Sequence, residues 1–169
     1  MSYSIRSFED GDAEALAELG RAAIGAIGPE AYTEEQVEAW LSNFAGPEVY
    51  QAQADAGTQI FIAADDDDNP VAYAMLELTG HLDHLYCHPD HTKEGIASSL
   101  LETAALYAKY NGITHLFTEA SEIAKPAFEG AGYSAVKKRT FEIDGVEITN
   151  WAMVREIEPA QPKAKKRAL

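Results

Sequence analysis

The sequence has few cysteines, few basic residues and no long apolar run. Its 169 residues include one cysteine, Cys87, which excludes an internal disulfide and the usual multi-cysteine zinc site. No apolar stretch approaches the roughly 20 residues that span a bilayer. The segment Met1–Arg6 lacks the basic and apolar pattern of a secretory signal. We therefore expect a soluble cytoplasmic protein with no membrane partner.

Acidic residues outnumber basic ones by 28 to 13, and the formal net charge is −15. Four of the basic residues lie in the last twelve positions, so residues 1–157 hold 9 basic and 27 acidic residues, a net charge of −18. A body of this sign repels phosphate backbones and attracts cationic amines, so we expect no nucleic-acid partner. An adaptation to solubility or salt explains the same charge.

The length fits a single domain with a substantial core. We predict a folded domain over residues 1–157 and a basic, disordered tail over residues 158–169, which contains Pro159 and Pro162. The apolar fraction of 46% is ordinary for a globular protein, so disorder of the whole chain is excluded.

Hydrophobic periodicity switches between helical and strand patterns along the chain. Asp10 or Asp12 is expected to cap the first helix, and Thr33 and Gln36 fit a capping box for the second. The resulting order, β-α-α-β-β-β-α-β-α-β-β, indicates a mixed α+β layered fold. The predicted helices cover residues 13–27, 34–44, 95–110 and 122–130, and the predicted strands cover residues 4–8, 59–64, 71–78, 81–87, 113–118, 134–143 and 146–154.

The most informative segment joins a strand to a helix. The strand Leu85-Tyr86-Cys87 leads through a proline turn into residues 92–97, where a helix begins. A helix N-terminus presents unpaired N–H groups and a positive dipole end, which together bind anions. Gly95 and the small Ala97 allow an anion to approach the backbone closely. The segment predicts a phosphate or pyrophosphate site, although an ordinary strand–helix turn shares the pattern.

These residues, in this order, resemble the GNAT superfamily of N-acetyltransferases, and within it the small YafP-like subgroup. The family's pyrophosphate signature, Gln/Arg-x-x-Gly-x-Gly/Ala, stands here as residues 92–97. Residues 121–133 resemble its late helix, residues 32–40 its early helices and residues 145–153 its closing hairpin. The resemblance covers roughly residues 3–156. It implies an α/β/α layered fold, with a mostly antiparallel sheet of six to seven strands and a splayed central strand pair.

The resemblance implies acetyl-CoA as the acetyl donor. Its donor site is expected to hold the pantetheine amides on the strand, the pyrophosphate on the helix start and the thioester arm on the late helix. These residues are Leu85, Tyr86, Cys87, Thr92, Lys93, Glu94, Gly95, Ile96, Ala97, Ser98, Ser121, Ala124 and Phe128.

The acceptor implied by the resemblance is an amine of a small molecule or peptide. Tyr32, Trp40 and Glu119 are expected to line its pocket, although core packing explains Tyr32 and Trp40 equally well. The resemblance also allows a homodimer.

Three positions depart from the family pattern. Thr92 replaces the usual Gln or Arg, and Glu94 brings a carboxylate near the expected pyrophosphate. We expect Glu94 to point to solvent, with Lys93 offsetting its charge. Phe128 stands where many relatives have a tyrosine that protonates the leaving thiolate. Another proton donor, such as Tyr86, Tyr133 or water, would then protonate the thiolate, or the thiolate leaves without protonation.

Direct attack on the thioester requires a base, because a free alkylamine has a pKa of about 10.4 and is mostly protonated near neutral pH. His81 and Asp83 lie two residues apart on one face of a strand, and His81 occupies the position where some relatives carry a general-base glutamate. We predict these two as catalytic, with Glu77 and Glu119 as alternatives. The predicted function is N-acetyl transfer in a ternary complex. The alternative is a non-catalytic acyl-CoA-binding or protein-interaction module with the same fold.

Two other features suggest chemistry at first sight. Cys87 resembles an acyl-accepting nucleophile, but its neighbour His88 points to the other face of the strand, so we predict a semi-buried core thiol. His81, His84, His88 and His91 fall within eleven residues. Their alternating directions give no ligand set of defined geometry, so we predict no metal site.

Overall fold

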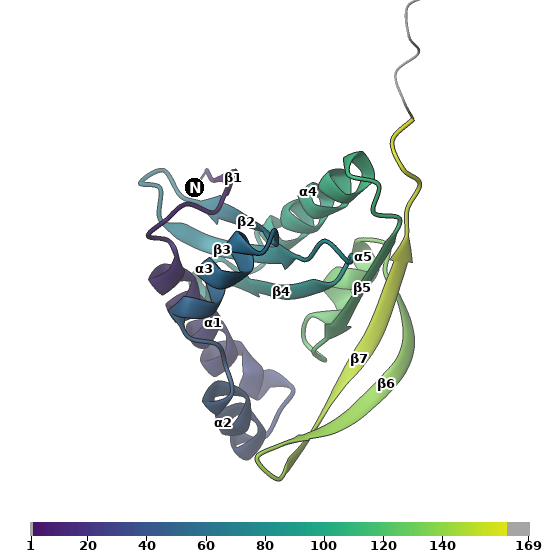
Figure 1. The fold of residues 1–169 in the computed structure, drawn as a ribbon. Coiled ribbons are helices and arrows are strands. Elements are labelled where there is room, and N and C mark those ends of the chain that lie inside the picture. Colours follow the sequence, from purple (N-terminus) through teal and green to yellow (C-terminus); the bar gives the residue numbers. More distant parts are fainter. Residues whose placement is uncertain (1, 162–169) are drawn as a thin grey trace, which may run out of the picture.

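The computed structural model describes residues 2–161, and its elements form a three-layer α+β arrangement (Figure 1). In chain order the elements are β1 (Ser4–Ser7), α1 (Ala13–Ile27), α2 (Glu34–Ser42), α3 (Pro47–Asp55), β2 (Gln59–Ala64), β3 (Pro70–Leu76), β4 (Leu82–Cys87), α4 (Ile96–Tyr110), β5 (His115–Ala120), α5 (Lys125–Gly130), β6 (Ser134–Ile143) and β7 (Val146–Glu156). Within residues 2–161, no helix is both long and apolar enough to cross a membrane.

The strands form two antiparallel sheets, one with the order β1-β2-β3-β4 and one with the order β5-β7-β6. One parallel bridge, between His81 and Phe117, joins them within the described residues. There the Phe117 N–H donates to the Gly80 carbonyl (3.1 Å) and Thr118 Oγ1 donates to the Leu82 carbonyl (2.7 Å). Beyond this point β4 and β5 diverge (Figure 1). The predicted splayed strand pair is confirmed.

Helices cover both faces of the four-stranded sheet. Helix α4 packs Leu100 and Leu101 on one face, where Ala72 and Ala74 leave room for a close approach. On the other face α1 and α3 pack side chains such as Leu16 against β2 and β3. A third cluster joins α1 and α2 to the β6–β7 hairpin, which reaches down to α2 in Figure 1.

Strand β4 contains a β-bulge at Asp83. Leu82 pairs with Leu76 and His84 pairs with Met75, so Asp83 has no partner in the ladder. A bulge resets the alternation of side chains between the two faces. Leu82 is therefore buried in the cluster under α4, whereas His84 packs on the opposite face against the ring of Tyr50.

The capping box predicted for α2 is confirmed. Thr33 Oγ1 accepts from the Gln36 N–H (3.2 Å), and Gln36 Oε1 accepts from the Thr33 N–H (2.9 Å). The prediction missed α3 altogether, because Gly46-Pro47 was interpreted only as the end of the preceding helix. Pro47 instead occupies the first turn of α3, where its missing N–H costs no hydrogen bond.

Some other boundaries also differ from the prediction. Helix α5 begins at Lys125 rather than near Glu122, because residues 121–124 form a separate turn. His81 precedes β4 and makes an isolated bridge instead of a strand pair. Residues 158–161 follow β7 without helix or strand, and the remainder of the predicted tail, residues 162–169, lies outside the described residues.

The predicted cap of α1 is wrong. Asp12 occupies the N-cap position, but its side chain makes no hydrogen bond to the helix. Its carboxylate instead accepts a bidentate pair from Arg6 Nη1 (2.8 Å) and Nη2 (3.0 Å), and it also accepts from the Glu9 N–H (2.8 Å). The hydrogen bond from Arg6 is the main cause of the lowered pKa of Asp12. This ion pair ties β1 to the start of α1.

We predict that Asp12→Ala lowers the free energy of unfolding at pH 7 by about 1–2 kcal/mol, because a charge-assisted hydrogen-bond pair is lost. The pKa of Asp12 is lowered in the folded state, so its contribution is present above the unfolded pKa and is lost as the pH falls through the folded value. Urea unfolding at stepwise lower pH should therefore show the two proteins converging. Asp10→Ala, at an exposed position, is the matched control. A difference that does not change with pH would contradict the assignment.

Candidate functional site

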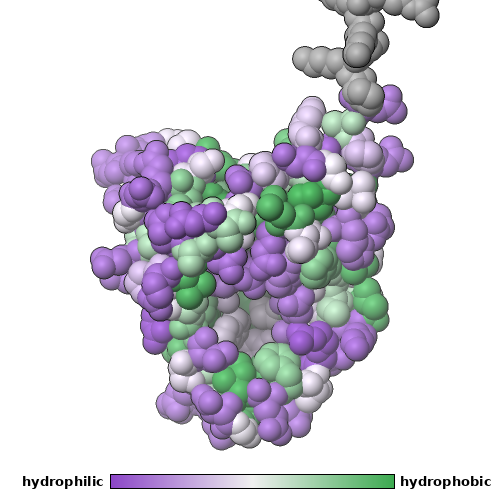
Figure 2. Space-filling model, viewed as in Figure 1, coloured by the Kyte–Doolittle hydropathy of each residue, from purple (hydrophilic) through white to green (hydrophobic). Residues whose placement is uncertain are grey.

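Two cavities lie on either side of the splayed strands. The large groove, of about 620 Å³, runs between the end of β4, the start of α4, α1 and the turn before α5. The small cavity, of about 300 Å³, lies between α2, the β4 bulge and the strands β5–β7. Trp40, Tyr86 and Ser121 line both, so the two spaces meet at this wall. Figure 2 shows a hollow in the face between α2 and the three-stranded sheet, surrounded by mostly hydrophilic residues.

The large groove brings together the predicted donor-site residues, with two exceptions. It is lined by Leu85, Tyr86, Cys87, Thr92, Lys93, Gly95, Ile96, Ala97, Ser98, Ser121 and Ala124. The two predicted residues that do not line it are Glu94 and Phe128. Segments far apart in the sequence thus form one continuous surface.

The start of α4 gives this groove an anion-binding end. Gly95 is the N-cap in a left-handed conformation (φ +76°), and no side chain caps the helix. The first helical hydrogen bond runs from the Ser99 N–H to the Gly95 carbonyl, so the N–H groups of residues 96–98 precede the helical ladder. A Cβ at Gly95 would meet nothing within 4 Å. This backbone can bind a phosphate group, and Lys93 on the groove wall adds positive charge.

Glu94 and Phe128 lie away from the groove. The Glu94 carboxylate is partly exposed and lies 3.4 Å from His91 Nδ1, in agreement with the expectation that it points outward. Phe128 is buried in the core, where its ring packs edge-on against Tyr133 at 5.0 Å between centroids. Tyr133 is buried too and lines neither cavity. Of the two tyrosines considered as proton donors, only Tyr86 reaches the cavities, and burial raises its pKa.

Five aromatic rings contribute to the small cavity's wall. Tyr32, Trp40, Phe44, Tyr86 and Phe141 all line it. The Tyr32 hydroxyl donates to the Thr149 carbonyl (2.9 Å) and accepts from the Glu122 N–H (2.9 Å), which ties β7 to the turn before α5. Tyr32 and Trp40 therefore combine the two roles left open by the sequence, because they line the cavity and also pack against each other at 5.6 Å.

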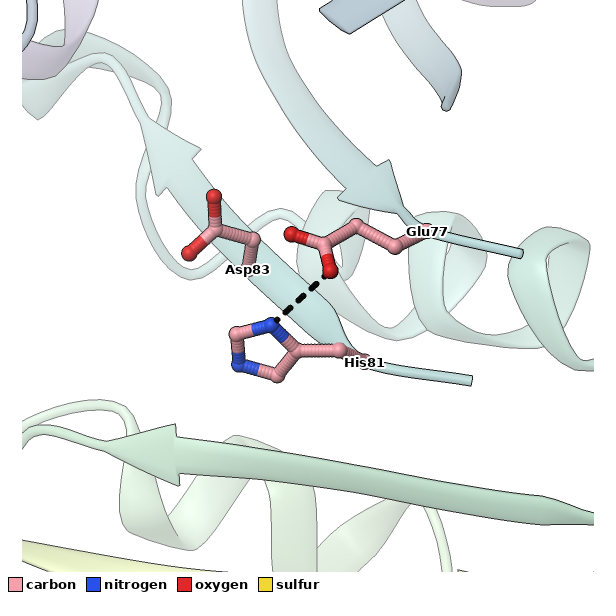
Figure 3. A group of neighbouring side chains, drawn as sticks. All are labelled: Glu77, His81 and Asp83. Atoms are coloured by element: carbon pink, nitrogen blue, oxygen red, sulfur yellow. Dashed lines mark ion pairs between the residues drawn. The ribbon is translucent and has the colours of Figure 1, made fainter. Parts of the chain in front are cut away.

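Carboxylates converge on His81 at the edge of the small cavity. His81 Nε2 lies 3.0 Å from Glu119 Oε1, and His81 Nδ1 lies 3.4 Å from Glu77 Oε2. Figure 3 shows Glu77, His81 and Asp83 pointing toward one another, and one ligand atom of each lies within 4.8 Å of the others. Asp83 and Glu119 line the cavity, whereas His81 lies behind them. The arrangement can pass a proton outward or hold a cation, and the absence of a metal stays a prediction.

His84 is a cavity residue that the sequence interpretation missed. Its Nδ1 lies 3.1 Å from the Tyr73 hydroxyl, which lies 2.6 Å from the Tyr50 hydroxyl. Burial lowers the pKa of His84, so the imidazole in the cavity wall is neutral near pH 7. Only the bulge at Asp83 turns His84 to this face, and the local sequence gives no signal for it. Phe44, Phe141 and Asn150 are further lining residues that were missed.

Cys87 behaves as the predicted core thiol. Its side chain packs against the cluster under α4, and Sγ donates to the His91 carbonyl (3.3 Å). Burial raises the pKa of this thiol to about 11, and the nearby Glu94 adds to the shift. The thiolate required of a nucleophile is therefore scarce at neutral pH.

Comparison with known proteins identifies the class. The family model described as the acetyltransferase (GNAT) domain matches residues 29–155. The chain belongs to this family, so the predictions of GNAT membership and of an N-acetyltransferase are confirmed.

The chain is similar over most of its length to several members. It is 28% identical over 152 residues, 90% of this chain and 95% of the relative, to an uncharacterized N-acetyltransferase, YafP, of Escherichia coli strain K12. A GCN5-related N-acetyltransferase from Rhodopseudomonas palustris superimposes with a TM-score of 0.83 at 29% identity, covering 93% of this chain and 97% of that one. PaiA N-acetyltransferase from Thermoplasma acidophilum, solved with coenzyme A, has a TM-score of 0.73 at 21% identity, covering 93% and 100%. The predicted α+β GNAT fold is confirmed.

We predict that iodoacetamide alkylates Cys87 in the native protein at pH 8 about 100-fold more slowly than it alkylates a free cysteine, because the thiolate fraction falls with the raised pKa. Mass spectrometry of timed samples measures the rate. The same reaction in denaturant is the control and should proceed at the free-thiol rate. Rapid labelling of the folded chain would mean that the thiol is ionised and accessible.

Proposed function

We propose that the protein transfers an acetyl group from acetyl-CoA to a primary amine of a small molecule or peptide, by direct attack in a ternary complex. The observation that carries this proposal is the meeting of the two cavities at Trp40, Tyr86 and Ser121. A donor in the large groove and an acceptor in the small cavity would face each other through one opening. Bound together, they would react without a covalent enzyme intermediate.

The open edge of β4 supports the placement of the pantetheine arm. The His88 N–H donates to the Val71 carbonyl, so the groups that face β3 belong to His88 and, by alternation, Tyr86. The backbone N–H and C=O groups of Leu85 and Cys87 then point toward the splay, where β5 has moved away. Such unpaired strand groups can hydrogen-bond the amides of an extended ligand. PaiA with coenzyme A and YncA of Salmonella typhimurium with acetyl-CoA are fold neighbours that bind this type of ligand.

The acceptor amine would give up its proton to Glu119. This carboxylate lines the small cavity and is hydrogen-bonded to His81, whose other ring nitrogen lies 3.4 Å from the partly exposed carboxylate of Glu77. We place Glu119 nearest the amine and His81 behind it as the relay, with Asp83 attracting the ammonium group. The His81 and Asp83 predicted from the sequence thus keep a part in the chemistry, but His81 acts through Glu119.

The reaction forms a C–N bond and breaks the C–S bond of the thioester. The amine nitrogen attacks the carbonyl carbon, its proton leaves through Glu119 and His81, and coenzyme A departs as a thiolate that takes a proton from solvent. Tyr86 stands at the opening, but burial raises its pKa, so the phenol holds its proton too tightly to be an efficient acid. It can donate a hydrogen bond to the charge that develops on oxygen or sulfur.

The donor site is tested by two variants of one residue. Gly95→Asp is expected to weaken acetyl-CoA binding at least about tenfold, because it places a carboxylate beside the pyrophosphate site. Gly95→Asn has nearly the same shape and tolerates the left-handed backbone without the charge. Isothermal calorimetry with acetyl-CoA measures both. Equal affinities for the two variants would contradict a pyrophosphate at the start of α4.

The acceptor chemistry is tested by Glu119→Gln. We expect kcat/KM for amines to fall by about 10²–10³-fold, because the amine loses its proton acceptor, with acetyl-CoA affinity unchanged. A thiol-release assay over a range of pH measures the effect, and the deficit should shrink at high pH as free amine accumulates. Glu129→Gln, at an exposed position on α5, is the matched control. Full activity of Glu119→Gln at every pH would refute the assignment, and acetyl-CoA binding without turnover of any amine would refute the proposed enzyme.

A further inference from the structure

The small cavity is lined by negatively charged side chains and by no lysine or arginine. Its wall contains the carboxylates of Asp83 and Glu119, and none of its lining residues is a lysine or arginine. The one imidazole in the wall, His84, is neutral because burial lowers its pKa. A ligand in this cavity therefore meets negatively charged partners for a cation but no positively charged lining residue for an anion.

One guanidinium lies next to the wall, and it is already engaged. Arg139 Nη1 donates to Asn150 Oδ1 (3.1 Å), and its guanidinium carbon lies 5.4 Å from the centroid of the Phe141 ring. Asn150 and Phe141 line the cavity, whereas Arg139 does not. The positive charge is thus held behind an amide and a ring and does not face the ligand.

Part of the remaining wall is aromatic, and the rest includes the amides of Asn43 and Asn150. Rings of Trp40, Phe44 and Tyr86 pack edge-on or tilted against one another, with centroids 5.4 to 6.5 Å apart. Ring faces attract an ammonium group and also pack against its carbon chain. The volume of about 300 Å³ limits the occupant to a compact molecule.

The following inference deepens the proposed function and rests on it. We propose that the acceptor is a small cationic amine that carries no carboxylate near the reacting nitrogen, such as a simple alkylamine, diamine or arylalkylamine, and that free amino acids are rejected. The ammonium group is attracted by Asp83 and Glu119. A carboxylate on the next carbon would be forced toward the same two charges, in a cavity with no cation to receive it.

The test compares amines with the amino acids from which they differ by one carboxylate. The pairs are tyramine and tyrosine, histamine and histidine, and agmatine and arginine, each assayed for thiol release and for the acetylated product by mass spectrometry. We expect kcat/KM to be at least about 30-fold higher for the amine of each pair. Tyrosine methyl ester separates charge from size, because it keeps the bulk of the carboxyl group. We expect it to react nearly as well as tyramine.

A variant that adds a positive charge to the cavity tests the same inference in the opposite direction. Asn43 lines the cavity at the end of α2, so Asn43→Arg would supply the missing cation. We expect this variant to raise kcat/KM for tyrosine relative to tyramine by about tenfold, while Asn43→Gln leaves the ratio unchanged. Unchanged acetyl-CoA binding by calorimetry shows that both variants are folded.

The outcomes separate this inference from the proposed function. Equal kcat/KM for both members of each pair overturns the inference alone. If the Arg139→Gln variant then no longer acetylated tyrosine, Arg139 would be identified as the residue that binds the carboxylate. A kcat/KM for tyrosine methyl ester as low as that for tyrosine also overturns the inference, because the bulk of the carboxyl group rather than its charge would then cause the rejection. A chain that binds acetyl-CoA but acetylates neither member of any pair overturns the proposed function and this inference with it.

Discussion

The structure depends on the small number of hydrogen bonds that join its two sheets. Between β4 and β5 the described residues show one parallel bridge, at His81 and Phe117, and two side-chain bonds, from Thr118 to the Leu82 carbonyl and between His81 and Glu119. Immediately beyond it the bulge at Asp83 bends β4, and the strands separate. Were the ladder to continue, the backbone edge of β4 would be satisfied by β5, and neither cavity would open at this point.

Leaving a strand edge unpaired inside a fold has a cost, and the surrounding structure offsets it. The three packed clusters lie on both sides of the opening, and α2 is tied to the β6–β7 hairpin by a hydrogen bond from Gln36 Nε2 to the Glu147 carbonyl (2.9 Å). The Tyr32 hydroxyl joins β7 to the turn that ends at α5. These contacts join the two halves of the fold on both sides of the opening.

The two cavities have opposite electrostatic character although they share a wall. The large groove ends at the N–H groups of α4 and at Lys93, which favour anions. The small cavity presents Asp83 and Glu119, which favour cations. Glu94 would disturb the first of these, but it does not line the groove, and its carboxylate lies 3.4 Å from His91 Nδ1. Under the proposed function, a phosphate-bearing donor and an amine would be attracted to different sides of the splay.

The sequence by itself determined the local elements and the anion site, because periodicity, capping residues and Gly95 act over a few neighbouring residues. It placed the strands and the long helices to within about two residues, and its family resemblance led to residues that the structure brings together in the large groove. It missed α3, whose buried face contains only Tyr50, and misjudged Asp12, whose partner Arg6 lies in β1. The tertiary structure alone decided which side chains meet in the small cavity. A one-residue bulge turns His84 inward and leaves His81 behind Glu119, and neither effect has a local signal because both depend on pairing with distant strands.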